Sequence, residues 1–329
     1  EIYTLSLHDA LPILVMLAIC TSFVLATTDY DNPYYFLQKH IVMLAVGLVA
    51  FIFCRRFNYL RWRYLMPGMV VFILISLVAV LLVGTEVNGA RRWLYAGGVG
   101  FQPAEFAKLA ALLLMAAYLA ARRKRGLKPS VFNLQLGIIG IMAVLTELEP
   151  DMGTAAIIFG VPFLMLVTAG APLRQLVPFA SVGAVALVGL MFLQPYRMER
   201  IKVMFDPWAD AQGKGYQTVQ SLSTIGSGGF WGMGLGSGVS KYDYLPEAHT
   251  DFAFAIFCQE HGFVGAMLVL LLMAVLLLYC VRIANRAADE FGQMLALGIM
   301  LLILGQGIAN VAMVSGMLPV IGVPLPFIS

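Results

Sequence analysis

An aspartate, Asp251, stands where a long polar stretch gives way to an apolar run that begins at Phe252. The stretch, residues 194–251, is the only long interval without an apolar run of membrane length. A charged side chain at such a boundary is costly unless it has a function. A carboxylate there could accept a proton from a substrate hydroxyl group. The alternative is that Thr250 and Asp251 cap the following helix. Glu260 would lie about half a turn around that helix, so Asp251 would act as a single base.

Cationic residues near the same face could bind an anionic group such as a diphosphate, because Arg and Lys hydrogen-bond phosphate oxygens strongly. Trp93 either contributes to such a site or anchors the chain at the membrane interface. The candidate substrate-binding residues are Trp93, Arg91, Arg92, Arg197, Arg200, Lys202 and His249.

Two further groups of charged residues have a structural and a functional interpretation. Glu105 and Lys108 are three residues apart, so they share a helix face and can form an ion pair, either structural or holding that helix against the site. Glu149 and Asp151 belong to an acidic stretch that is either a solvated loop or a cation or proton site. Oxygen ligands there could hold Mg²⁺ or Mn²⁺, but no metal-specific spacing is present and no cofactor is evident.

The segment Gly226–Gly238 contains seven glycines in thirteen residues. It matches neither a P-loop nor a dinucleotide-binding fingerprint. We therefore expect a close backbone approach, which either clamps a lipid-linked phosphate or makes a sharp turn.

Membrane helices must position these residues. Of 329 residues, 60% are hydrophobic and 12% are charged, which excludes an ordinary soluble domain and predicts an all-α polytopic membrane protein. Residues 1–13 resemble a non-native lead, and residues 14–329 are expected to form one transmembrane domain, truncated before a tenth helix. A large outer loop, about 194–250, separates the seventh and eighth helices. The nine visible helices are predicted at about 11–26, 40–54, 65–83, 103–121, 134–146, 154–169, 176–193, 252–281 and 291–314.

The distribution of charge predicts the orientation. Twelve of the 21 Lys and Arg residues fall in loops on one side of the predicted helices, which the positive-inside rule makes cytoplasmic. Fourteen acids, from Asp29 to Glu260, fall on or near the other side. The outer face is therefore the expected polar working surface.

Several motifs, taken in order, resemble the SEDS family (shape, elongation, division and sporulation proteins, including FtsW, RodA and SpoVE). They are NGARRW (88–93), FQPAEFAK (101–108), EPDMGT (149–154), YRMERI (196–201), YLPEAHTDFAF (244–254) and GMLPVIGVPLPFIS (316–329). The residues of these motifs are most similar to those of the FtsW division branch. One departure is Glu149, which stands where the family usually has Gln.

The resemblance implies a ten-helix peptidoglycan glycosyltransferase that polymerises lipid II outside the bacterial inner membrane, at the division septum. Asp251 would be the essential acid, Trp93 a sensitive outer-loop residue, and Glu105 with Lys108 the family's buried pair. The implied partners are lipid II, a class B penicillin-binding transpeptidase and other division proteins, with no nucleic acid. A RodA-like elongation polymerase, a lipid II flippase and a non-catalytic division scaffold remain alternatives.

Overall fold

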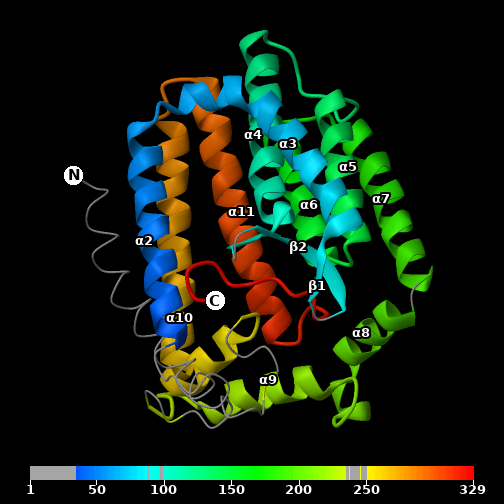
Figure 1. Cartoon of the computed structure of the whole chain (residues 1–329), viewed down its shortest axis with the longest axis vertical. Helices are drawn as coiled ribbons and strands as arrows, with labels where there is room; N and C mark the ends of the chain where they lie inside the picture. Colours follow the sequence, from blue (N-terminus) through cyan, green and yellow to red (C-terminus); the bar gives the residue numbers. More distant parts are fainter. Residues whose placement is uncertain are drawn as a thin grey trace. The chain divides into compact units, whose positions relative to one another are not determined.

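The computed structural model describes residues 35–87, 89–96, 99–193, 195–234, 237, 245 and 250–329, and it is mostly helical (Figure 1). The helix predicted at about 11–26, the lead predicted at 1–13 and the candidate His249 lie outside these residues. The chain forms two compact units. Unit 1 comprises Glu1–Arg56, Gln194–Ala274 and Gln306–Ser329, and unit 2 comprises Phe57–Leu193 and Val275–Gly305.

Unit 2 is built around α4, Pro103–Lys124, whose two ends suit the helix dipole. Pro103 occupies the first turn with the acid Glu105, and the last turn is cationic. Small alanine side chains on α4 are completely buried, which lets neighbouring helices approach closely. Figure 1 shows α4 among α3 (Trp62–Val83), α5 (Leu134–Leu148) and α6 (Met152–Thr168), all of which contact it.

The ends of these helices are specified locally. The short helix η1, Tyr59–Arg61, precedes α3, and α7, Leu173–Leu193, follows α6. Asn133 caps α5 by accepting a hydrogen bond from the backbone N–H of Leu136 (2.7 Å). Asp151 caps α6 in the same way through the N–H of Thr154 (3.1 Å).

A small antiparallel sheet in unit 2 corrects the all-α prediction. Strands β1 (Thr85–Val87), β2 (Ala90–Ala96) and β3 (Val99–Phe101) connect α3 to α4 in the order β1-β2-β3. Pairing of Glu86 with Arg91 sets the register of the first two strands. Gly89 has φ +76°, a backbone conformation that hairpin turns need and that glycine adopts without strain. The Asn-Gly pair at 88–89 was the overlooked hairpin signal.

Unit 1 contains α2 (Tyr35–Arg56), α8 (Pro195–Phe205), η2 (Pro207–Asp210) and α9 (Tyr216–Ser227). The predicted outer loop is therefore helical in part. The first part of α10 (Ala253–Asn285) and the last part of α11 (Glu290–Val314) also belong to this unit. A second apolar core joins α10, α11 and the C-terminal segment 315–329.

Eight of the nine predicted helices correspond to the described helices α2, α3, α4, α5, α6, α7, α10 and α11. Among the described residues, four helical stretches are long and apolar enough to cross a membrane: Tyr59–Val83, Pro103–Lys124, Ala253–Asn285 and Glu290–Val314. The count of nine membrane helices stays a prediction.

Candidate functional site

Asp251 lies in a turn directly before α10 and is half-buried. The next residue, Phe252, is 1% exposed and belongs to the apolar core of unit 1. Asn310 of α11, which is completely buried, donates hydrogen bonds from Nδ2 to the carbonyl oxygens of Asp251 (2.8 Å) and Val323 (2.6 Å). One buried amide therefore holds the Asp251 backbone and the C-terminal segment together.

The C-terminal segment also brings Arg200 to this region. The guanidinium of Arg200, from α8, donates a hydrogen bond to the carbonyl oxygen of Val320. Two residues on, Gly322 packs against Asp251: a Cβ built there would lie 3.4 Å from Oδ2 of Asp251. The backbone of Gly322 has φ +67°, which favours glycine. Residues 320–323 are thus contacted by both predicted site residues, and we call this arrangement the Asp251 site.

The other cations predicted for this loop are placed less completely. Lys202 is exposed on α8, and its ammonium makes no ion pair with the residues that the structure describes. Arg197 also lies on α8, but its side chain is outside the described part of the chain. Their predicted contact with a diphosphate stays a prediction.

The glycine-rich segment packs backbone against backbone onto α10, as the predicted close approach requires. At Gly262 the helix is interrupted (φ +67°, ψ −164°), which frees backbone groups on both sides. The carbonyl oxygens of Gln259 and Glu260 accept hydrogen bonds from the N–H groups of Met233 and Gly234 at 2.9 and 3.1 Å. The segment therefore supplies hydrogen-bond partners to backbone groups that the break in α10 leaves unpaired within the helix, as buried backbone groups require.

In unit 2 the hairpin carries Arg91, Arg92 and Trp93 on β2. Arg92 is half-buried, and its guanidinium donates to the backbone carbonyl oxygens of Glu149 (3.2 Å) and Pro150. Arg92 thus anchors the loop between α5 and α6. The pair of Arg91 with Glu86 is exposed and long (3.9 Å), so it contributes little stability.

Trp93 is half-buried, and its ring packs against the backbone of Gly100 and lies 6.3 Å from the ring of Tyr95. A Cβ at Gly100 would come within 3.1 Å of the Trp93 ring, so the glycine leaves room for it. The sheet therefore fixes the position of Trp93 on one side. Its predicted contact with substrate stays a prediction.

Glu149 is the most unusual acid that the structure describes. It is 1% exposed, and neither oxygen of its carboxyl group has a hydrogen-bond partner among the described residues. Burial is the main reason that the pKa of Glu149 rises from 4.5 to about 8. The negative charge of Asp151 raises this pKa further, while the positive charge of Arg92 lowers it. The solvated-loop interpretation of Glu149 is therefore wrong.

The interpretation of Glu149 and Asp151 as metal ligands does not fit the described residues. Across the described ranges, no three His, Cys, Asp or Glu residues gather closely enough to hold a metal ion. One oxygen of Asp151 is already used to cap α6, and the guanidinium of Arg92 lies at the carbonyl groups of the same loop. A divalent cation would meet a repulsive charge there, so we derive no chemical step through a metal.

The predicted ion pair between Glu105 and Lys108 is confirmed, with Nζ of Lys108 2.8 Å from Oε2 of Glu105. The Lys108 side chain is only 5% exposed, whereas that of Glu105 is 43% exposed. The carboxylate therefore neutralises a nearly buried ammonium group in the first turns of α4.

Comparison with known proteins identifies the family. Residues 2–329 match the cell cycle protein family of FtsW, RodA and SpoVE. The chain belongs to this family. It is accordingly a multi-pass membrane protein, and its apolar helices are those of the FtsW/RodA/SpoVE fold.

Individual relatives cover most of the chain. Stage V sporulation protein E of Bacillus subtilis is 37% identical over 94% of this chain and 85% of its own length. The probable peptidoglycan glycosyltransferase FtsW of Shewanella sediminis is 38% identical over 99% of this chain and 82% of its own.

Solved structures agree with this assignment. A peptidoglycan synthase complex, described as coordinating polymerization and crosslinking, has a chain with TM-score 0.77 and 27% identity, covering 97% of this chain and 90% of that one. RodA of Thermus thermophilus has TM-score 0.64 and 26% identity, covering 97% and 88%.

Asn310 is the residue of the Asp251 site that sequence reasoning missed. The signal was available, because an amide within a 25-residue apolar helix needs a partner to be tolerated. Gln306, one turn earlier, was overlooked for the same reason; its Nε2 donates to the carbonyl oxygen of Pro324 (3.0 Å).

Proposed function

We propose that this chain is a peptidoglycan glycosyltransferase that polymerises lipid II, with Asp251 as its catalytic base. The observation that carries the proposal is the similarity of nearly the whole chain to relatives named peptidoglycan glycosyltransferase FtsW, at 38% identity. The arrangement of the Asp251 site supports it, because a half-buried acid is held there by a buried amide.

In the proposed reaction, Asp251 accepts the proton of the 4-hydroxyl group of one lipid II GlcNAc unit. The hydroxyl oxygen forms a bond to C1 of the muramyl unit of the growing strand. The bond from C1 to the diphosphate oxygen breaks, and undecaprenyl diphosphate leaves with the bonding electrons. One displacement inverts C1 and gives a β-1,4 link, so a single base is sufficient. The activated bond is already in the substrate, so no nucleotide is consumed.

Charge on the departing diphosphate must be offset by cations. Arg200 and Lys202 on α8 are the proposed contributors in unit 1, because Arg200 reaches the segment that touches Asp251. Arg91 and Trp93 remain proposed substrate contacts. Arg92 also remains a proposed substrate contact, and within unit 2 its guanidinium holds the loop that contains Glu149.

The proposed location is the outer face of the bacterial inner membrane at the division septum. A crosslinking enzyme of the class B penicillin-binding type is the proposed partner, since a similar chain belongs to a complex that coordinates polymerization with crosslinking. The similarity to Thermus RodA favours an elongation polymerase as the second candidate function.

The decisive experiment measures glycan strands made from lipid II by the full chain together with its transpeptidase partner. Asp251→Asn should lower the polymerisation rate at least about 100-fold, as expected for loss of a general base. Asp206→Asn is the matched control, because Asp206 is an exposed acid of the same loop. Strand synthesis by Asp251→Asn at the rate of this control would remove Asp251 from the reaction. Translocation of labelled lipid II without polymer in either protein would favour the flippase alternative.

A further inference from the structure

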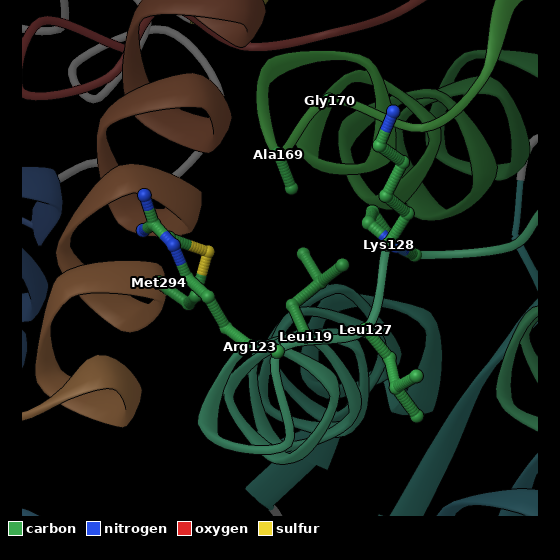
Figure 2. A pocket seen from close by; sticks show the side chains of 9 residues that line it. Leu119, Arg123, Leu127, Lys128, Ala169, Gly170 and Met294 are labelled. Carbon is green, nitrogen blue, oxygen red and sulfur yellow. The ribbon is translucent and has the colours of Figure 1, made fainter.

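A cavity of about 320 Å³ opens at the cationic end of unit 2, away from the hairpin. It lies where the end of α4, the turn after α6 and the beginning of α11 come together. Leu119 and Arg123 line it from α4, Lys128 from the loop that follows, Ala169 from the turn and Met294 from α11. Figure 2 shows Arg123 and Lys128 on opposite sides of the cavity, with Leu119 and Ala169 between them.

Contacts within unit 2 define this end of the molecule. Tyr59 donates a hydrogen bond to Asp289. The guanidinium of Arg123 donates a hydrogen bond to Oε1 of Gln293 (2.6 Å) and forms an ion pair with Glu290 (3.3 Å). The described residues at this end include two acids, Asp289 and Glu290. Cations at the same end include Arg122, Arg123 and Lys124 in the last turn of α4, and Arg125 and Lys128 directly after it.

The two cations of the cavity differ in how they are paired. The charge of Arg123 is balanced in part by Glu290. The ammonium of Lys128 is exposed and makes no ion pair or hydrogen bond with the described residues. Helices α4 and α6 both end here, and their C-terminal dipoles would repel an anion, whereas α11 begins here and its N-terminal dipole would attract one. These partial charges oppose one another, so an anion in the cavity depends mainly on the full charges of Arg123 and Lys128.

We propose that this cavity binds the phosphate-bearing head group of an anionic phospholipid from the leaflet that faces the cationic end of unit 2. The lining is both cationic and apolar, which suits an amphiphilic ligand. The phosphate would contact Lys128 and Arg123. The adjoining glycerol and first methylene groups would pack on Leu119, Ala169 and Met294. Basic pockets between membrane helices commonly bind anionic head groups. The volume suits a head group rather than a single ion. The site is separate from the Asp251 site and from the proposed reaction.

The test is native mass spectrometry of the purified full chain with phosphatidylglycerol or with phosphatidylcholine of the same acyl chains. We expect the anionic lipid to be retained more strongly, and Lys128→Gln to weaken its binding about fivefold. Lys124→Gln is the matched control, because it removes an exposed charge four residues away that does not line the cavity. Its binding should stay within about twofold of the original protein.

A second variant tests the cavity by volume. Ala169→Leu should fill the space and weaken binding of phosphatidylglycerol while all charges remain. Equal weakening by Lys128→Gln and Lys124→Gln would overturn the proposal, since it would show a general surface charge effect. Equal retention of both lipids would also overturn it. Displacement of the lipid by inorganic phosphate, with no contribution from the acyl chains, would assign the cavity to free phosphate and refute the lipid.

Discussion

Replacing Glu149 with glutamine should stabilise the protein in a way that depends on pH. The pKa of Glu149 is about 8 in the folded protein and 4.5 ordinarily, so the folded protein keeps this proton up to about pH 8. Between these values the unfolded chain has lost the proton that the folded chain still binds. Stability therefore falls as the pH rises from about 4.5 to about 8, and it levels off above that.

The magnitude follows from the pKa shift. Each pH unit above the ordinary pKa of 4.5, up to the raised pKa, lowers the free energy of unfolding by about 1.4 kcal/mol relative to a neutral side chain. The carboxyl group of Glu149 therefore lowers that free energy by about 3 kcal/mol at pH 7 and by about 5 kcal/mol above pH 8. Glutamine has a similar volume and no charge, so Glu149→Gln removes this cost. For a chain of this size the gain corresponds to roughly 5 °C in melting temperature at pH 7. Any effect of the amide on packing should be the same at every pH.

The assay is thermal unfolding in detergent, followed by intrinsic fluorescence from about pH 5 to about pH 9. The difference in melting temperature between Glu149→Gln and the original protein should be small at the acidic end and reach a plateau above about pH 8. Glu147→Gln is the matched control, because this half-buried acid lies two residues away. When the same pair is compared with Arg92→Gln present in both proteins, the pH at which the difference in melting temperature is half complete should rise, since Arg92 lowers the pKa of Glu149. A difference that does not change with pH, or the same rise in Glu147→Gln, would refute the reasoning.

Two further predictions concern the Asp251 site and the break in α10. Asn310→Ala should lower kcat for strand synthesis about tenfold with KM nearly unchanged, because Asn310 positions Asp251. Gln306→Ala is the control: it loses a hydrogen bond to Pro324, so it should destabilise the folded protein to a similar extent without that loss of kcat. An equal loss in both variants would make Asn310 merely structural. Gly232→Ala should lower the free energy of unfolding by about 2 kcal/mol or more, because its Cβ would overlap the carbonyl oxygen of Glu260 at a φ of +86°. Gly226→Ala is the control, because its Cβ would meet no atom within 4 Å, and thermal unfolding should show that only the change at Gly232 destabilises strongly.

Local sequence was sufficient wherever the cause is local. Runs of apolar residues placed α3, α4, α10 and α11, because a membrane helix needs its length of hydrophobic side chains. The spacing of Glu105 and Lys108 predicted their ion pair, since residues three apart share a helix face. The density of glycine in Gly226–Gly238 predicted close packing, although not the broken helix that it satisfies.

Tertiary structure decided what depends on distant parts of the chain. The environment of Glu149 depends on burial and on Arg92, which lies 57 residues earlier. The link from Asn310 to Asp251 spans 59 residues. Hydrophobic pattern and helical spacing do not report such pairs, because they describe one element at a time. The sequence by itself determined a helical membrane protein with an acid at the start of α10, and only folding decided which side chains hold that acid and how strongly Glu149 binds its proton.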